Sequence, residues 1–436
     1  MYLSLLSDEV LAEAGKRENN RVYSTAVVMW LMVFQRLQGE GCMESAVLEV
    51  PELPTIFWPK PCKRLRTGAG NMSSYTGAYN AARQDLPLST VEQFSDHAFA
   101  QLTACTDGSL PELGGRRAFV LDGTTARTPH TEDLKLRYPP TSNQEGESHW
   151  PLIKILVAHD LVTGLGMRPE WGAVNGPDAV SEQRLFERAV KRLPEGAIVV
   201  ADANFGVLSV AFAAVRQGHP VVVRMTAQRA RSLLLQEPLR DGTDRHIVWK
   251  PTRADRKSHP DLPADACIRG RLIVTQVQPS DESAPFLLCL FTTLDDDQEK
   301  IVNLYGQRWN VETDIGTLKN ELHLDQLSCK TPQMIDKEIE IAMLSYNLVR
   351  AVICQAAQKA GIAPRRFSFT KVKRVIAVFE RRIAAAKSPQ EAEELVQQMN
   401  RCLGQSILPR RRKKRKTYPR AVWHSSKPFP RRKAQQ

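Results

Sequence analysis

The sequence lacks the short patterns that mark several common kinds of site. Its eight cysteines are never closer together than 20 positions, so it contains no CxxC pair and no close zinc-knuckle spacing. GxxxxGKS, GxxxxGKT, HExxH and GxSxG are also absent, and Gly164-x-Gly166 is followed by Pro169 where a dinucleotide fingerprint needs glycine. None of the nine histidines begins the His-x-x-Arg of a tyrosine recombinase. These absences argue against zinc, nucleotide, serine hydrolase and tyrosine recombinase sites.

Long apolar runs are missing as well. The longest, at residues 26–34, is too short to span a bilayer, and the amino terminus has no basic region followed by a small-residue cleavage site. We therefore expect a cytoplasmic protein with no membrane segment, whose cysteines remain thiols in a reducing compartment.

Acidic residues are absent from one segment. Residues 409–436 contain 12 lysines and arginines and no aspartate or glutamate, whereas residues 1–408 hold 48 basic and 48 acidic residues. We expect this basic tail to stay unfolded until it meets a polyanion, and to make salt-sensitive, sequence-independent contacts with phosphates. A tail that only aids solubility is the alternative.

Residues 1–112 predict a small helical domain. Apolar residues at helical spacing indicate helices at 24–37 and 89–102, and Ser89 and Glu92 have the spacing of a capping box. A loop rich in proline and glycine lies between these helices and carries four basic residues: Lys60, Lys63, Arg64 and Arg66.

Residues 113–225 predict an α/β layer with a mixed sheet. The expected order is three strands, a helix, a strand, a helix and a strand, at residues 118–121, 152–158, 167–174, 181–193, 197–201, 207–215 and 220–224. Residues 226–283 are polar and broken by prolines, and we interpret them as a mostly β insertion. The layer resumes over 284–330 with a strand and one long helix at 295–322, followed by helices over 331–408 and the tail at 409–436.

Three carboxylates are candidates for a metal site. Asp122 and Asp202 each follow a predicted strand, and neighbouring strands place such residues side by side at the ligand-binding edge of an open sheet. The long helix carries four polar residues within an arc of roughly 60°: Tyr305, Arg308, Glu312 and Lys319. The three carboxylates, Asp122, Asp202 and Glu312, could together hold two Mg²⁺ ions about 4 Å apart and serve in-line phosphoryl transfer. Ion pairs on a solvated helix face, and aspartates that favour turns, are the alternative interpretation.

The helix pattern Tyr305-x2-Arg308-x3-Glu312-x6-Lys319 resembles the YREK signature of DDE transposases of the insertion-sequence-four type, whose catalytic domain has an RNase H-like fold. Neighbouring segments are similar to the same family, and together the resemblance covers roughly residues 25–430. These segments are residues 119–124, 201–206, 307–309, 345–350 and 418–420.

The resemblance implies roles for individual residues. Asp122, Asp202 and Glu312 would be the metal-binding triad, with Mg²⁺ as cofactor and Mn²⁺ able to replace it. Arg308 and Lys319 would contact DNA phosphates near the cleaved end. Tyr305 would help to position that strand, and Trp249 of the insertion would stack on a flipped base.

The resemblance also implies the fold and the activity. We expect an RNase H-like mixed sheet with helices, interrupted by the β insertion and flanked by helical regions. Metal-dependent cleavage at the element ends would be followed by strand transfer into target DNA, by a cut-and-paste route through a hairpin. The amino-terminal domain would recognise the terminal inverted repeats of double-stranded DNA, and a homodimer would hold two ends together. The alternatives are a catalytically silent DNA-binding protein derived from a transposase, and a structure-specific nuclease of the same fold.

Overall fold

The computed structural model describes residues 21–409, apart from 40–41, 54–56, 59–61, 63–64, 66–73, 144–145, 148 and 279–283. The basic tail from residue 410 onward lies outside the described residues, as do the four basic side chains of the predicted loop, Lys60, Lys63, Arg64 and Arg66. All eight cysteines are described, and they are free thiols.

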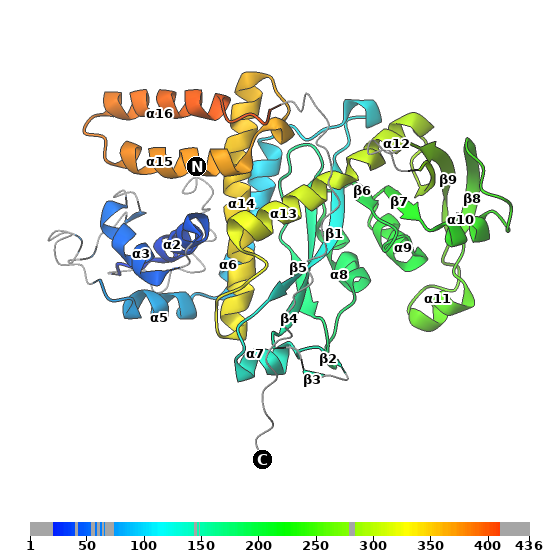
Figure 1. The fold of residues 1–436 in the computed structure, drawn as a ribbon, viewed down its shortest axis with the longest axis horizontal. Coiled ribbons are helices and arrows are strands. Elements are labelled where there is room, and N and C mark those ends of the chain that lie inside the picture. The colour runs from blue at the N-terminus through cyan, green and yellow to red at the C-terminus, as the bar shows by residue number, and fades with distance from the viewer. Residues whose placement is uncertain are drawn as a thin grey trace, which may run out of the picture.

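An eight-stranded sheet forms the centre of the molecule (Figure 1). Its order is β5-β4-β1-β6-β7-β10-β9-β8; β6 pairs in parallel with β1 and β7, and the other pairs are antiparallel. The mixed α/β sheet that we expected is therefore confirmed. The strands are Ala118–Arg127 (β1), Leu152–Asp160 (β4), Glu170–Ala173 (β5), Ile198–Ala201 (β6), Val221–Met225 (β7), Thr243–Trp249 (β8), Ile268–Val277 (β9) and Phe286–Thr292 (β10), with a separate ribbon of Ser142–Asn143 (β2) and Gly146–Glu147 (β3).

The predicted insertion, residues 226–283, extends this sheet. Its strands β8 and β9 pair with each other, and β9 pairs with β10, so backbone hydrogen bonds join the insertion to the core. Two short helices, α10 (Ala227–Leu233) and α11 (Arg253–Ser258), lie in the same segment. The segment is therefore continuous with the central sheet, while its boundaries remain a prediction.

Alternate residues of β1 point into two different cores, as the two-residue period of a strand requires. Phe119 and Leu121 belong to a core that includes helices α8 (Glu182–Ala189) and α9 (Leu208–Arg216). Ala118 and Val120 belong to a second core on the opposite face. That second core includes α12 (Gln298–Gly306), α13 (Asn310–Leu322) and α14 (Pro332–Ala360). The central strands are thus covered on both faces, whereas the edge strand β8 is largely exposed.

The remaining helices gather around α14 (Figure 1). The amino-terminal region, confirmed as helical, packs α2 (Thr25–Gln38) and α6 (Leu88–Ala104) on α14 and also contains α3 (Met43–Glu49) and α5 (Gly77–Asp85). At the other end of the chain, α15 (Phe369–Ala384) and α16 (Pro389–Gly404) pack as a pair. Shorter elements are α7 (Glu132–Arg137) and the 3-10 turns Val50–Glu52 (η3), Pro111–Leu113 (η6), Val190–Arg192 (η7), Gln307–Trp309 (η8) and Pro364–Arg366 (η9).

The expected capping box of α6 is wrong. The helix begins one residue earlier, with Pro87 as its N-cap and no side-chain cap bond. Glu92 instead accepts a hydrogen bond from Arg168 at 2.7 Å. Glu92 therefore forms a tertiary ion pair with Arg168 and does not cap the start of α6.

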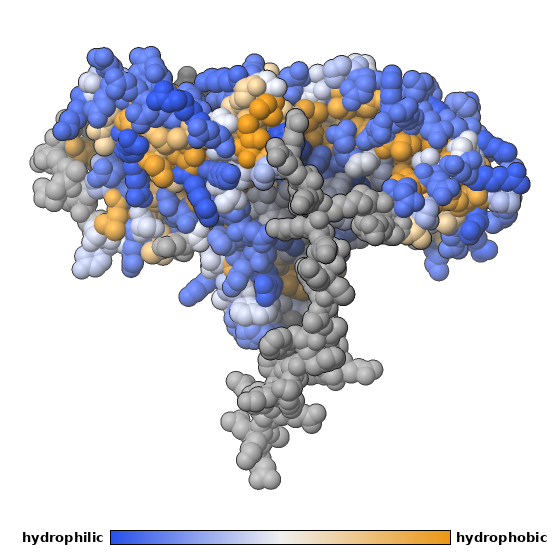
Figure 2. Space-filling view, turned by 45° about the horizontal axis from the view of Figure 1, so that its top comes forward, coloured by the Kyte–Doolittle hydropathy of each residue, from blue (hydrophilic) through white to orange (hydrophobic). Residues whose placement is uncertain are grey.

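Helix α14 is long and apolar enough to cross a membrane by length and composition alone. Most of its apolar stretch, however, is buried inside the molecule between the amino-terminal helices and the sheet. Figure 2 shows a mainly hydrophilic face, with apolar side chains gathered in limited patches. We interpret α14 as the central packing helix of the fold.

Candidate active site

Asp122 and Asp202 lie at the same level on neighbouring parallel strands. The register pairs Ala118 with Ile198 and Val120 with Val200, so the same offset places Asp122 beside Asp202. β6 ends at Ala201, directly before Asp202, as predicted. The prediction that the first strand ends before Asp122 is wrong, because β4 pairs along β1 as far as Arg127 and keeps it extended.

The helix that was expected to run unbroken over 295–322 is divided. Tyr305 lies at the end of α12 and Arg308 in the 3-10 turn η8, while Glu312 and Lys319 lie in the first and last turns of α13. The geometric argument from a single continuous helix is therefore only partly right. Arg308 and Glu312 still face each other at i,i+4 spacing, with Arg308 Nη2 2.9 Å from Glu312 Oε1.

Arg308 joins the strand carboxylate to the helix carboxylate. Its Nη1 atom lies 3.5 Å from Asp122 Oδ2, while its Nη2 atom holds Glu312. The guanidinium side chain is 15% exposed, so this pairing is largely shielded from solvent. Asp122, Asp202, Arg308 and Glu312 therefore form one cluster, which we call the carboxylate cluster.

The carboxylate cluster contains three carboxylates and one guanidinium, so negative charge is in excess. Burial, together with the nearby carboxylates of Asp202 and Glu182, raises the pKa of Asp122 to about 6. The hydrogen bond from Gly123 N, at 2.8 Å, and the charge of Arg308 act in the opposite direction without cancelling this effect. A cation placed among these oxygens would relieve the repulsion.

The donor set fits a hard divalent cation. Carboxylate oxygens are the ligands that Mg²⁺ prefers, and Asp122 and Asp202 present them from adjacent strands. In the part of the chain that the structure describes, no three acidic, histidine or cysteine side chains are grouped closely enough to ligate one ion. The Arg308 guanidinium pairs with two of the three candidate ligands, Asp122 and Glu312.

Tyr305 and Lys319 are placed differently from each other. Tyr305 is 7% exposed, and burial raises the pKa of its hydroxyl, which hydrogen-bonds with Arg224. Its ring is therefore part of the second core and not an open contact surface. Lys319 is half-buried, on the same helix as Glu312.

Trp249 does not join the carboxylate cluster. It lies at the end of the outer strand β8, is 6% exposed, and packs edge to face on Phe291 with ring centroids 4.9 Å apart. A ring packed in this way has no free face for a base, so the expected stacking is not supported. Trp309, directly after Arg308, is 66% exposed and presents an open aromatic face at the site.

Asp314 anchors α13 to neighbouring elements, a role that sequence reasoning missed. Its fully buried carboxylate accepts hydrogen bonds from Arg365 Nη1 at 2.8 and 2.9 Å, Arg350 Nη2 at 2.7 Å and the Tyr346 hydroxyl at 2.9 Å. Burial alone would raise the pKa of Asp314, but the charges of Arg365 and Arg350 outweigh it and lower that pKa. The i,i+4 spacing of Tyr346 and Arg350 was the available signal.

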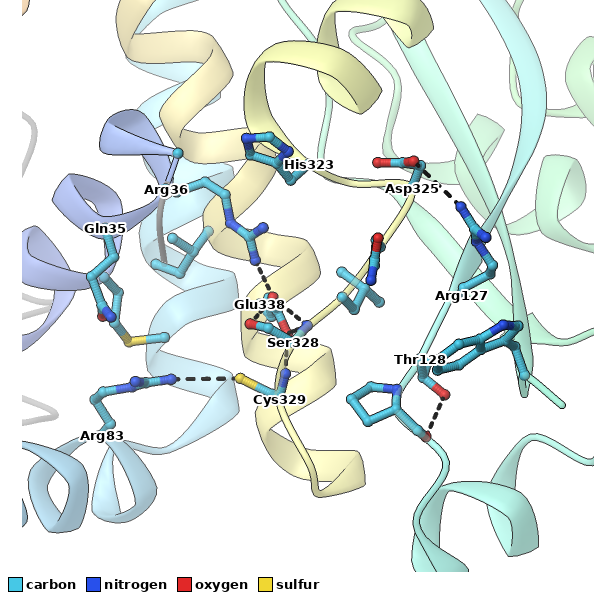
Figure 3. Close-up of a pocket in the computed structure, with 17 residues that line it drawn as sticks. Gln35, Arg36, Arg83, Arg127, Thr128, His323, Asp325, Ser328, Cys329 and Glu338 are labelled. Carbon is cyan, nitrogen blue, oxygen red and sulfur yellow. Dashed lines mark hydrogen bonds and ion pairs between the residues drawn. The ribbon is translucent and has the colours of Figure 1, made fainter. Parts of the chain in front are cut away.

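A cleft of about 580 Å³ lies beyond the carboxylate cluster, between the amino-terminal helices and the sheet (Figure 3). Its lining combines basic and aromatic side chains with one buried acid: Arg36, Arg83, Arg127, Trp150, His323 and Glu338. Arg36 pairs with Glu338, whereas Arg127 is half exposed and reaches only 3.9 Å from Asp325. The cleft therefore offers positive charge next to an indole.

The cleft connects to the carboxylate cluster through two elements. Arg127 follows Asp122 by five residues on β1, a distance of about 17 Å along an extended strand. Helix α13 continues from Glu312 to its last residue, Leu322, and the next residue, His323, lines the same cleft. The chain then pairs with the end of β1 through hydrogen bonds between Arg127 and the backbone of Asp325 and Leu327, both at 2.9 Å.

Comparison with known proteins gives the family. The model of the family described as "Transposase DDE domain" matches residues 113–348, a range that includes Asp122, Asp202 and Glu312. Over 325 residues the chain is 24% identical to Transposase InsG for insertion sequence element IS4 of Escherichia coli (strain K12), an alignment that covers 72% of this chain and 69% of that relative. The chain therefore belongs to the DDE transposase family, of the insertion-sequence-four type.

Proposed function

We propose that this transposase performs its metal-dependent phosphoryl transfer on DNA at the carboxylate cluster, with Asp122, Asp202 and Glu312 as the metal ligands. The single observation that carries the assignment is that Arg308 joins Asp122 of β1 to Glu312 of α13, while the register of β1 and β6 sets Asp202 beside Asp122. The oxygen-only donor set and the raised pKa of Asp122 support it.

Each residue of the carboxylate cluster has a separate task. Asp122 and Asp202 would hold the cation from the rigid sheet, and Glu312 would hold it from α13. When bound, a pair of Mg²⁺ ions, or Mn²⁺ in their place, would activate the attacking oxygen and stabilise the leaving oxygen. Arg308 pairs with both Asp122 and Glu312, and we assign its guanidinium to binding the oxygens of the DNA phosphate at this cluster.

One cluster can serve the successive steps of transposition. Cleavage at the element end, attack of the freed 3′ hydroxyl on the opposite strand to give a hairpin, reopening of that hairpin, and attack on target DNA are all displacements at phosphorus. None of them requires a covalent protein intermediate, so a single carboxylate set suffices. We propose this cut-and-paste order for the chain.

The DNA path follows α13. Lys319, Arg127 and the cleft continue from Glu312 along one line of elements, and their positive charges suit the DNA backbone. We assign Lys319 and Arg127 to phosphate contacts on this path. Terminal inverted repeats would be bound by the amino-terminal helical domain, and two ends would be held by a homodimer acting on cytoplasmic, nucleoid DNA.

The test is cleavage of a DNA fragment that carries the native element ends. Asp122→Asn, Asp202→Asn and Glu312→Gln are each expected to abolish Mg²⁺-dependent cleavage while the band shift of the same fragment persists. Glu299→Gln, on the exposed face of the neighbouring α12, is the matched control and should cleave normally. Full cleavage by any of the three variants would remove that residue from the triad. Binding without cleavage by the wild type would favour the catalytically silent alternative.

A further inference from the structure

A fourth acidic side chain, Glu182, faces the carboxylate cluster from the opposite helical layer. It lies in the first turn of α8, whose N-cap Ser181 accepts a hydrogen bond from Arg184 N at 3.2 Å. The helix end is therefore already capped without Glu182. An acidic residue in a first turn often serves only the helix dipole, and such a residue would point into solvent.

Glu182 instead packs against the backbone next to Asp122. A Cβ atom built on Gly123 would lie 2.6 Å from Glu182 Oε1, a separation that real Cβ atoms do not show. Because Gly123 has no side chain, the carboxylate reaches the strand directly beside Asp122. A second consequence is electrostatic, since Glu182 is one of the charges acting on Asp122.

Glu182 also holds the turn that carries Asp202. Its Oε2 atom accepts a hydrogen bond from Asn204 Nδ2, and Asn204 N donates to Asp202 Oδ1 at 2.9 Å. Gln183, the next residue of α8, donates from Nε2 to Asn204 O at 3.2 Å. The first turn of α8 thus fixes Asn204 by its side chain and its backbone, and Asn204 in turn orients the Asp202 carboxylate.

We propose that Glu182 is a positioning residue of the cation site, which orients Asp202 through Asn204 and adds negative charge beside Asp122. The proposal rests on the proposed function, because it assumes that Asp122 and Asp202 bind a divalent cation. The ligand class is a hard divalent ion such as Mg²⁺ or Mn²⁺.

The experiment measures Mn²⁺ binding to the full chain without DNA, with free Mn²⁺ followed by electron paramagnetic resonance. Glu182→Gln keeps the size and the acceptor for Asn204 but removes the charge, and it is expected to weaken Mn²⁺ binding about tenfold. Its melting temperature in EDTA should stay equal to that of the wild type or rise, since one like charge has been removed. Glu182→Asp should recover part of the affinity. The control Glu187→Gln lies on the same helix, pairs with Arg184 at 3.0 Å, and should bind as the wild type does.

Asn204→Ala provides a second route that leaves Glu182 charged. It removes the link to the Asp202 turn and is also expected to weaken Mn²⁺ binding, so the proposal stays testable if Glu182→Gln folds poorly. Wild-type affinity in both variants would overturn the role of Glu182 alone, provided that Asp122→Asn loses binding. A wild-type chain that binds no Mn²⁺, equal to Asp122→Asn, would overturn the assignment of the carboxylate cluster itself.

Discussion

Two glutamates of α14 should respond in opposite directions to the loss of charge. The carboxylate of Glu340 is fully buried, and its Oε2 atom has no hydrogen-bond partner among the described residues. Arg168 Nη1 lies 3.3 Å from Glu340 Oε1 but is shared with Glu92 at 2.7 Å, and the Nε of the same guanidinium pairs with Asp96. Burial therefore dominates and raises the pKa of Glu340 to about 8, despite the charge of Arg168.

The sign follows from linkage. The folded state binds the proton of Glu340 more tightly than the unfolded state does. The stability that this proton contributes to the folded protein is lost as the pH rises from the ordinary pKa of 4.5 through the folded pKa of about 8. A shift of this size corresponds to an upper bound of about 5 kcal/mol above pH 8. Allowing for relaxation and water entry, Glu340→Gln should raise the free energy of unfolding by about 2 to 4 kcal/mol at pH 9 and change it little at pH 5.

Thermal melting between pH 5 and pH 9 measures this difference. With about 2 °C per kcal/mol for a large domain, Glu340→Gln should melt several degrees above the wild type at pH 9. A difference that does not grow with pH, or a lower melting temperature at pH 9, would refute the reasoning.

Glu338, two residues earlier, is the matched control. Its carboxylate accepts hydrogen bonds from the backbone of Ser328 and Cys329 at 2.9 Å and pairs with Arg36, and these groups outweigh burial and lower its pKa. Glu338→Gln should therefore destabilise the protein, by about 2 to 4 kcal/mol near neutral pH. That contribution is present above the unfolded pKa of Glu338 and is lost as the pH falls through its lower folded value.

Three further changes test the anchor, the cleft and the tail. Asp314→Ala leaves Arg350 buried without its partner and should cost about 3 to 5 kcal/mol in thermal melting; a loss below about 1 kcal/mol would contradict the anchor. Arg127→Ala should weaken binding of element-end DNA and reduce its salt slope by about one, whereas Arg184→Ala on α8 should not; equal slopes would remove the cleft from the DNA path. Deleting residues 409–436 should weaken non-specific DNA binding and flatten its salt dependence, and an unaltered slope would leave the tail without this role.

The sequence was informative where local rules decide the geometry. A short apolar strand followed by Asp202, and an i,i+4 pair of Arg308 and Glu312, follow from periodicity alone and are found in the structure. The adjacency of Asp122 and Asp202 needed only the rule that parallel neighbours share an edge. The predicted carboxyl end of the first strand was wrong for a non-local reason, because pairing with β4 keeps Gly123 extended.

Other features depend on contacts that no local pattern encodes. Trp249 ends the short strand β8, and the sequence does not reveal that its ring packs edge to face on Phe291 of another strand. From the sequence, Glu182 is an ordinary acidic residue in the first turn of a helix. Only the fold shows that it packs against Gly123. The 3-10 turn η8 leaves the helical periodicity almost unchanged, so the break between α12 and α13 was not visible either.

Contacts outside the carboxylate cluster hold the backbone that carries the carboxylates. Asp314, two residues after Glu312, fixes α13 to Arg350 of α14 and to Arg365, while backbone pairing fixes β1 and β6. Contacts within the protein therefore hold the helix and the strands, and Arg308 bridges Asp122 of the strand and Glu312 of the helix. In the proposed cation site, rotation of the Arg308 and Glu312 side chains would release the Glu312 carboxylate while Asp314 holds α13 in place. We infer that cation binding and DNA phosphate binding are coupled at Arg308, since each carboxylate taken over by the cation frees one edge of the guanidinium for a phosphate.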